Sequence, residues 1–255
     1  MTDTTVTAAV LLIGDELLSG RTQDSNLQSI AEHIGPLGVQ VREARVVPDV
    51  HDTIVAALNA LRLAYDYVFT TGGIGPTHDD ITADAVAAAF GVALIERADM
   101  IAILTERYGA NGDSLTAARR RMARAPAEAS LIVNPVSGAP GFQMDNVFVL
   151  AGVPGIMKGM LEDVGHRLKG GVVMMSRSVR GRGVREGDIG GPLGALQDAL
   201  QNVALGSYPY FRGPEDFGVV LVARSTDLAV LDAAVEALTA LMRAAGGEPE
   251  VDPER

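Results

Sequence analysis

The sequence has no cysteine and no tryptophan among its 255 residues, and only 4% of its residues are aromatic. The lack of cysteine excludes disulfide bonds, thiolate nucleophiles and zinc sites built from thiolates. The scarcity of aromatic rings disfavours a surface on which nucleic-acid bases stack. A formal net charge of −11 argues against binding to a phosphate backbone. We therefore expect no nucleic-acid partner, although a local turn can still attract a small anion.

The sequence also lacks the signals of secretion and of membrane insertion. Its first residues, Met1 to Thr5, do not form the basic start of a secretory signal. No apolar run approaches the roughly 20 residues that a helix needs to cross a bilayer. We therefore expect a cytoplasmic protein with no membrane partner.

Strand and helix patterns alternate over the first 90 residues. Apolar runs predict strands at 8–13, 39–47 and 67–71, and apolar residues at helical spacing predict helices near 27–34, 54–61 and 83–90. Such alternation is typical of α/β proteins, in which helices lie on both sides of a largely parallel sheet. A further helical pattern covers 100–107, and short strands are expected at 131–133 and 147–150, with a turn-forming segment rich in proline and glycine at 134–142 between them.

The pattern changes after Gly170-Gly171, which predicts a domain boundary. We expect one domain over residues 1–169 and a small α/β domain over residues 170–255. In the second domain we predict strands at 172–179 and 218–223, and a helix over 188–203 that glycine and proline interrupt early. A second helix is expected over 228–245, and the tail at 248–255 is expected to fray.

The most informative segment is a glycine-rich turn at residues 70–82, between a predicted strand and a predicted helix. Glycines let a ligand approach the backbone, and N–H groups at a helix N-terminus favour an anion. Asp79 and Asp80 are candidates to hold a divalent cation such as Mg²⁺ or to take a proton. The alternative is that either aspartate only caps the helix that follows. The candidate phosphate-binding residues of the turn are Thr71, Gly72, Gly73, Gly75, Pro76, Thr77 and Thr82.

Other polar residues are expected near the same edge of the sheet. Asp15 and Glu16 directly follow the first predicted strand, where ligands of parallel sheets bind, but they also fit a solvated loop. Asp24 and Asn26 precede a helix, and capping fully explains one of them. For the arginines at 119–121 and at 177–185 we favour a solvated surface over contact with an anion.

Several motifs of the sequence together resemble those of a known family. The segment 70–82 is similar to the signature of molybdopterin-binding (MoaB/Mog-type) domains, in the branch found in the N-terminal half of competence/damage-inducible CinA proteins and in eukaryotic FAD synthases. Residues 14–21 with 24–26 match the same branch. Asn134-Pro135, residues 139–142 and Gly152-Val153-Pro154 are further matches, so that the resemblance covers about the first 165 residues.

The resemblance implies a three-layer α/β/α fold with molybdopterin as a possible ligand, its phosphate on the glycine turn. It implies that Asp80 assists adenylyl transfer and that the second acidic position of the site falls near Asp24. For the CinA branch it implies a different activity, metal-dependent hydrolysis of ADP-ribose at its diphosphate. The sequence departs from the family at Ser137-Gly138, where Gly-Thr is usual, and at Ile156, where Glu is usual.

Three functions therefore stay open. The leading hypothesis is binding of a phosphorylated pterin or nucleotide, with a link to molybdenum cofactor metabolism, in which Ser137 and Gly138 join the ligand-binding set. The second is a diphosphatase in which the N–H groups of the glycine turn hold the diphosphate and Asp79 and Asp80 hold the metal, with Asp15 as a further candidate ligand. The third is a regulatory domain without catalysis. We also expect a homo-oligomer, a dimer or a trimer.

Overall fold

The structure is a computed structural model, which describes residues 4–110, 112 and 114–252. It divides into two units, residues 1–171 and residues 172–255, and each unit is described by itself. The boundary between the units falls after Gly171, two residues later than the boundary after residue 169 that the sequence predicts.

The first unit is built on a six-stranded sheet in the order β2-β1-β3-β8-β7-β6. The first four strands of that order are parallel, and β7 and β6 extend the sheet by antiparallel pairing. The bounds are β1 (Val6–Ile13), β2 (Val39–Val47), β3 (Tyr67–Thr71), β6 (Ser130–Ile132), β7 (Gly141–Met144) and β8 (Val147–Leu150).

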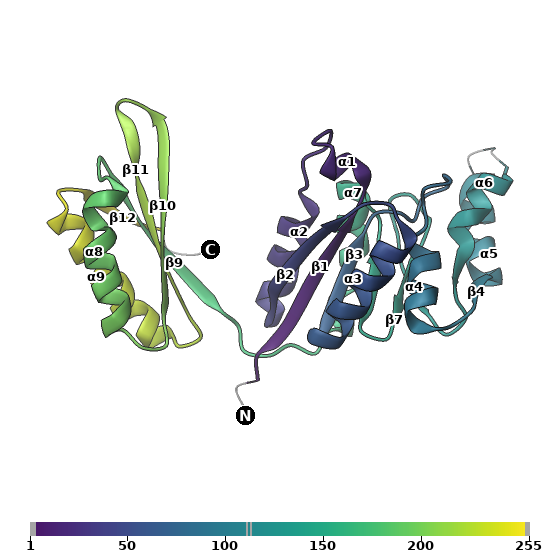
Figure 1. Ribbon diagram of the computed structural model, residues 1–255, viewed down its shortest axis with the longest axis horizontal. Helices are drawn as coiled ribbons and strands as arrows, with labels where there is room; N and C mark the ends of the chain where they lie inside the picture. Colours follow the sequence, from purple (N-terminus) through teal and green to yellow (C-terminus); the bar gives the residue numbers. More distant parts are fainter. Residues whose placement is uncertain (1–3, 111, 113, 253–255) are drawn as a thin grey trace. The chain divides into compact units, whose positions relative to one another are not determined.

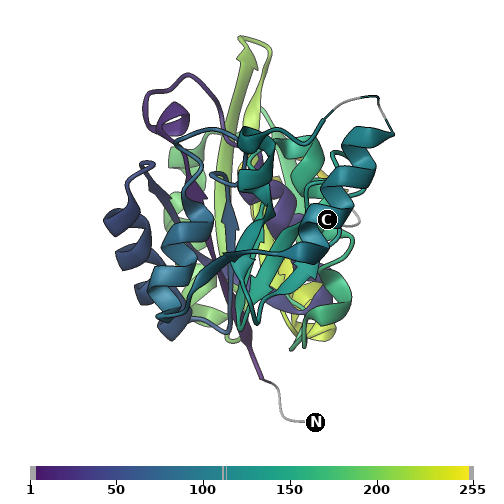
Figure 2. The same cartoon turned by 90° about the vertical axis from the view of Figure 1, so that its right-hand side faces the viewer.

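Helices cover both faces of this sheet, as the alternation in the sequence predicts (Figure 1). Buried residues of β1 alternate between two cores: Leu11 packs in one with α3 and α4, and Val10 packs in the other with α2 and α7. Figure 2 shows α3 and α4 beside each other. The bounds are α1 (Asp15–Leu18), α2 (Asn26–Ile34), α3 (His51–Ala64), α4 (Thr82–Phe90), α5 (Ala98–Gly109), α6 (Ala117–Arg120) and α7 (Pro154–Leu161), with a small sheet of β4 (Leu94–Glu96) and β5 (Arg124–Pro126).

The second unit is a four-stranded antiparallel sheet in the order β10-β11-β9-β12. Along the chain its elements follow β-α-β-β-α-β, which with this strand order is the split β-α-β arrangement of ferredoxin-like domains. The core joins Val179, Val219 and Leu221 of the sheet to Ile189 and Leu238 of the two helices. The bounds are β9 (Met175–Arg182), α8 (Glu186–Ala199), β10 (Ala204–Gly213), β11 (Asp216–Ser225), α9 (Leu228–Ala244) and β12 (Glu248–Asp252).

Three local predictions are wrong. Residues 248–252 do not fray, because they pair with β9 as the edge strand β12; residues 253–255 lie outside the described residues. Gly141 and Phe142 belong to β7 and not to a turn, because Phe142 pairs with Val149 across a hairpin. The helix α8 runs through Pro192 without a break, and its buried Ile189 anchors it to the core.

Among the described residues, no helix has both the length and the apolar composition that crossing a membrane requires.

Candidate functional site

The glycine turn joins β3 to α4 and is packed too tightly for side chains at two positions. Gly72 and Gly73 have φ angles of 102° and 67°, which side chains rarely adopt. A Cβ at Gly72 would lie 2.1 Å from the carbonyl oxygen of Ile13, and one at Gly73 would lie 2.2 Å from Oγ1 of Thr82. The turn therefore brings bare backbone against the carboxyl end of β1.

Thr82 holds the two glycines in place. Its buried hydroxyl donates to the carbonyl of Gly72 (2.9 Å), and its N–H donates to the carbonyl of Gly73 (3.0 Å). The prediction that this hydroxyl donates to a phosphate is wrong, since its hydrogen is already engaged inside the protein. Thr71 is also buried, in β3. Both threonines are therefore buried and lie outside the described lining of the cavity beside the turn.

Asp80 closes the outer part of the turn. Its Oδ2 accepts the N–H of Thr77 (2.7 Å) and also the Thr77 hydroxyl. The alternative that Asp80 caps the next helix is wrong, because the N-cap of α4 is Ile81 and no side chain caps it. The Thr77 hydroxyl, predicted as a phosphate donor, is likewise directed at Asp80. These bonds fix the loop that carries Gly75 and Pro76.

Arg121 ties this loop to a distant part of the chain. Its Nε donates to the carbonyl of Thr77 (3.1 Å) and its Nη2 to the carbonyl of Asp80 (3.4 Å). The sequence favours a solvated surface for this arginine over contact with an anion, and the partly exposed side chain also donates to these two backbone carbonyls. The sequence shows only a run of arginines, and the contact depends on the fold that brings them to the turn.

The turn lies on a cavity of about 580 Å³ within the first unit. Its volume falls in the range of about 300 to 1,000 Å³ that is usual for small-molecule sites. The cavity includes eight of the predicted site residues: Glu16, Gly72, Gly73, Gly75, Pro76, Asp79, Asp80 and Ser137. The other predicted residues are not part of its described lining: Asp15, Asp24, Asn26, Thr71, Thr77, Thr82 and Gly138.

Three consecutive N–H groups of the turn are available to a ligand. Within the described residues, the N–H groups of Gly73, Ile74 and Gly75 donate to no protein acceptor. All three residues line the cavity. Successive backbone N–H groups in a turn can form a favourable site for phosphate oxygens.

Asp24 and Asn26 have structural partners. The Asp24 carboxylate, one residue before the N-cap Ser25, accepts the N–H groups of Asn26 and Leu27, each at 3.1 Å, and so satisfies two donors in the first turn of α2. The buried Asn26 amide donates to the carbonyl of Gly152 (2.7 Å), which joins α2 to the loop before α7. Of these two residues, Asp24 is therefore the one whose contacts stabilise the start of α2, and Asn26 binds the backbone of a different segment.

Asn134 shapes the opposite wall of the cavity. Its amide donates to the Ser137 hydroxyl (2.6 Å) and to the carbonyl of Ala139 (2.7 Å), and its Oδ1 accepts the N–H groups of Val136 and Ser137. These four bonds satisfy the buried side chain and hold Ser137 at the cavity. Gly138 turns the chain beside it, with a φ of 84°.

Asp49, which is not among the predicted site residues, follows β2 and lines the cavity. Its Oδ2 accepts the N–H of Asp15 (2.9 Å). Burial raises the pKa of the Asp49 carboxyl, and the negative charges of Asp15, Glu16 and Asp79 raise it further against the lowering effect of that hydrogen bond. A carboxylate after a parallel strand at this edge is the signal that identifies it.

Asp79 has the opposite electrostatic character. The nearby Thr77 side chain, which donates to Asp80 in this conformation and can turn to Asp79, lowers the pKa of the Asp79 carboxyl below its usual value, and the residue's own N–H and the charge of His78 lower it further. His78 lies 3.8 Å from this carboxylate, and its side chain is 98% exposed. Asp79 therefore stays ionised at the cavity, where it disfavours a bare anion and favours a cation.

The described residues do not form a complete metal site. No three histidine, aspartate or glutamate side chains among them come together as ligands for one ion. Of the two predicted metal ligands, Asp80 already accepts two hydrogen bonds from Thr77. The residues present do not fit a metal ion that the protein alone would hold.

Comparison with known proteins gives two family matches. Residues 9–170 match the family described as "Probable molybdopterin binding domain", and residues 174–248 match "FAD synthase, middle domain". A CinA-like protein of Gemmatimonas aurantiaca is 32% identical over 212 residues, which cover 78% of this chain and 50% of the relative. A protein of Pyrobaculum calidifontis is 36% identical over 191 residues, which cover 72% of this chain and 73% of the relative.

One solved structure is similar in both sequence and fold. It is the crystal structure of the protein CinA with unknown function from Thermoplasma acidophilum, at 34% identity and a TM-score of 0.59. The match covers 64% of this chain and 99% of that chain. The present chain spans about half the length of the Gemmatimonas relative.

Proposed function

Because this chain belongs to the probable molybdopterin binding domain family, with CinA-like relatives, we propose that its first unit binds a phosphorylated pterin or a nucleotide at the glycine turn. One observation carries the proposal. The N–H groups of Gly73, Ile74 and Gly75 have no hydrogen-bond acceptor among the described residues, and these three residues line the 580 Å³ cavity. A phosphate there meets three consecutive backbone donors in the loop between β3 and α4. The proposed role belongs to molybdenum cofactor metabolism.

The acidic residues set a condition on the ligand. Glu16, Asp49 and Asp79 line the same cavity, so that a bare phosphate meets repulsion as well as the backbone donors. A divalent cation that enters with the phosphates relieves this repulsion, since Mg²⁺ usually binds one or two carboxylates together with substrate phosphates. We therefore propose that the cation binds with the ligand and not before it.

Isothermal titration of the full chain tests both parts of the proposal. We expect molybdopterin, its adenylate, AMP or ADP-ribose to bind, and Mg²⁺ to increase the affinity without binding alone. Asp80→Ala releases Thr77 from the turn and should weaken binding about tenfold, whereas Glu128→Ala, at an exposed position, should not change it. Absence of binding by all four ligands, with and without Mg²⁺, contradicts the proposal.

A second candidate function is hydrolysis of a nucleotide diphosphate such as ADP-ribose, and Asp49 favours it. A carboxyl whose pKa is raised by burial is a better proton acceptor at neutral pH than an ordinary aspartate. In the proposed step, water attacks one phosphorus of the diphosphate, the bridging P–O bond breaks, and Asp49 accepts the proton from the water. AMP and ribose 5-phosphate are the products.

Asp49→Asn tests this candidate because asparagine keeps an acceptor for the N–H of Asp15 but cannot take the proton. We expect the release of AMP from ADP-ribose to fall about 100-fold or more, while binding of ADP-ribose persists. Unchanged turnover in Asp49→Asn excludes Asp49 as the base. Tight binding without turnover in the unaltered protein supports binding alone.

A further inference from the structure

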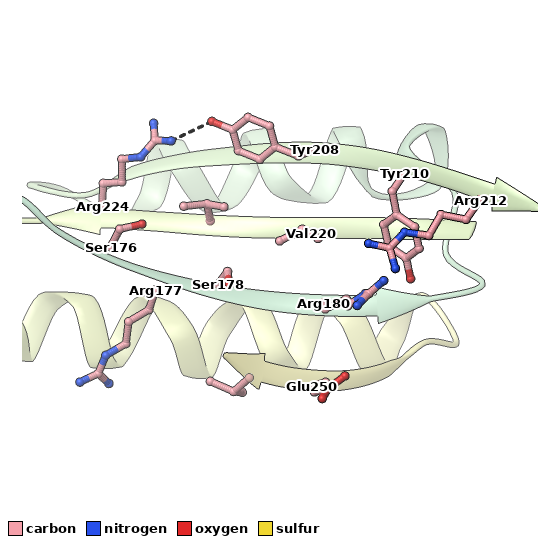
Figure 3. Close-up of a pocket in the computed structure, with 12 residues that line it drawn as sticks. Ser176, Arg177, Ser178, Arg180, Tyr208, Tyr210, Arg212, Val220, Arg224 and Glu250 are labelled. Atoms are coloured by element: carbon pink, nitrogen blue, oxygen red, sulfur yellow. Dashed lines mark hydrogen bonds between the residues drawn. The ribbon is translucent and has the colours of Figure 1, made fainter. Parts of the chain in front are cut away.

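The second unit has a sheet with one covered face and one open face. The alternating residues Val179, Val219 and Leu221 are buried beneath α8 and α9. The residues between them point to the other face, where the described part of this unit places no helix. A cavity of about 770 Å³ lies on this open face (Figure 3). We define the basic-aromatic face by five of its residues: Arg180, Arg212, Arg224, Tyr208 and Tyr210.

Strand register brings these five residues together. Tyr208 of β10 pairs with Val220 of β11, and Val220 pairs in turn with Arg180 of β9. Tyr210 and Arg212 follow Tyr208 on the same face of β10, because alternate residues of a strand share a face. Arg224 lies further along β11. The face therefore draws on three adjacent strands, and no short sequence motif reveals it.

Tyrosine rings hold the three arginines. The Cζ atom of Arg180 lies 4.5 Å from the centroid of the Tyr210 ring, and that of Arg212 lies 5.7 Å from it. Arg224 donates from Nη2 to the Tyr208 hydroxyl (2.9 Å), with its Cζ 6.0 Å from that ring. Stacking on an aromatic ring orders a guanidinium without neutralising its charge.

Carboxylates lie near one of these arginines but form no close ion pair within the described residues: the charges of Asp216 and Glu250 add to the effect of the Tyr210 hydroxyl, which raises the pKa of Arg180. None of the three arginines makes an ion pair in this described part of the chain, whereas Arg177, at the margin of the same cavity, is paired with Asp232 of α9. Residues 172–255 contain more acidic than basic residues. Three arginines without an ion pair thus gather on one face of an otherwise acidic unit, and an anion complements their charge.

The remaining lining residues fit an apolar, planar group beside the anion. Val220 and Val222 form part of the cavity lining between the tyrosines and β9, and Ser176 and Ser178 add hydroxyl groups. A base or pterin ring can pack on valine and tyrosine, and serine can hydrogen-bond its sugar or ring edge. The cavity volume is within the range of about 300 to 1,000 Å³ for small-molecule sites.

From this arrangement we infer that the basic-aromatic face is a binding site for a small nucleoside phosphate, separate from the glycine turn. The arginines bind the phosphate, and the tyrosines and valines contact the base. Glu250 of β12 lines the same cavity. A long phosphodiester chain that crossed the sheet would meet this carboxylate, which favours a small ligand over single-stranded nucleic acid.

The test is a titration of the full chain with AMP, followed by amide NMR. We expect saturable shifts at Tyr208, Tyr210 and Val220 that persist when the glycine turn is altered by Asp80→Ala. Arg180→Gln and Arg224→Gln should each weaken binding at this face about tenfold or more. Arg243→Gln removes the same charge from α9, on the other side of the sheet, and should leave it unchanged.

Several results would overturn the inference. One is the absence of shifts on this face at millimolar AMP in the unaltered protein. Another is equal binding of AMP and inorganic phosphate, which would mean that the nucleoside makes no contact. Affinity that rises with the length of a single-stranded oligonucleotide would identify a nucleic-acid surface instead. The amide shifts are measured at residues of β10 and β11. They therefore report binding at this face whether or not a ligand binds at the glycine turn.

Discussion

Gly73→Ala is the most informative single perturbation of the glycine turn, because the chain contains a matched glycine elsewhere. Gly73 has a φ of 67°, and Gly91, at the end of α4, has a φ of 66°. Alanine costs roughly 1–2 kcal/mol in this left-handed conformation. At Gly91 a Cβ meets nothing within 4 Å, so that this backbone cost is the whole expected effect.

At Gly73 a second cost is added. The new Cβ would lie 2.2 Å from Oγ1 of Thr82, which must move away. That movement breaks the hydrogen bond from the Thr82 hydroxyl to the carbonyl of Gly72, whose net contribution is about 0.5–1.5 kcal/mol. We therefore expect Gly73→Ala to lower the free energy of unfolding by roughly 2–3 kcal/mol, about 1 kcal/mol more than Gly91→Ala.

Urea unfolding of the full chain, followed by circular dichroism, measures both variants. A double-mutant cycle with Thr82→Ala adds a sharper test. Thr82→Ala should cost about 1 kcal/mol in the unaltered protein and nearly nothing in Gly73→Ala, because the bond is then already lost. If Gly73→Ala destabilises no more than Gly91→Ala, or if the two changes at residues 73 and 82 add independently, the described packing of the turn is wrong.

Three further predictions follow from other contacts. Asp49→Asn should increase the free energy of unfolding at neutral pH relative to the unaltered protein, because the buried Asp49 carboxylate, whose pKa is raised, disfavours folding while it is ionised. The difference should shrink as the pH falls toward 3.8, the ordinary pKa of an aspartate, because the carboxyl then takes a proton. Urea unfolding at pH 7 and pH 4 measures this, and a gap that widens at pH 4 contradicts it. Arg124→Ala removes both hydrogen bonds to the partly buried Asp84 and should cost about 1–2 kcal/mol, whereas Arg243→Ala should cost less than about 0.5 kcal/mol. Arg121→Ala should weaken nucleotide binding at the glycine turn with little effect at the basic-aromatic face, and equal weakening at both sites would refute its local role.

The sequence predicted the layered fold well because its elements carry strong local signals. The strands 39–47 and 67–71 coincide with β2 and β3, and the alternation of strands and helices predicted the parallel sheet. The strand β12 was missed because glycine and proline, near Gly247 and at Pro249, look like an irregular tail. Only pairing with β9 makes that segment a strand.

The candidate site was predicted in part for a similar reason. The glycine turn is contiguous in sequence, and seven of its residues, Asp80 among them, line the cavity. Thr82 was misassigned because sequence does not show whether a hydroxyl points into a cavity or back to the chain. Asp49 and Arg121 were missed because their contacts to Asp15 and to the turn join segments far apart in sequence. The basic-aromatic face depends on strand register, which a single sequence does not reveal.

The most direct test of the central claim is an amide NMR titration with ADP-ribose and Mg²⁺ that observes the glycine turn. The proposed function predicts saturable shifts at Gly73, Ile74 and Gly75, and their loss or marked weakening in Gly73→Ala but not in Gly91→Ala. If these three amides do not respond while ligand binds elsewhere, or if no ligand binds, the glycine turn is not the phosphate site.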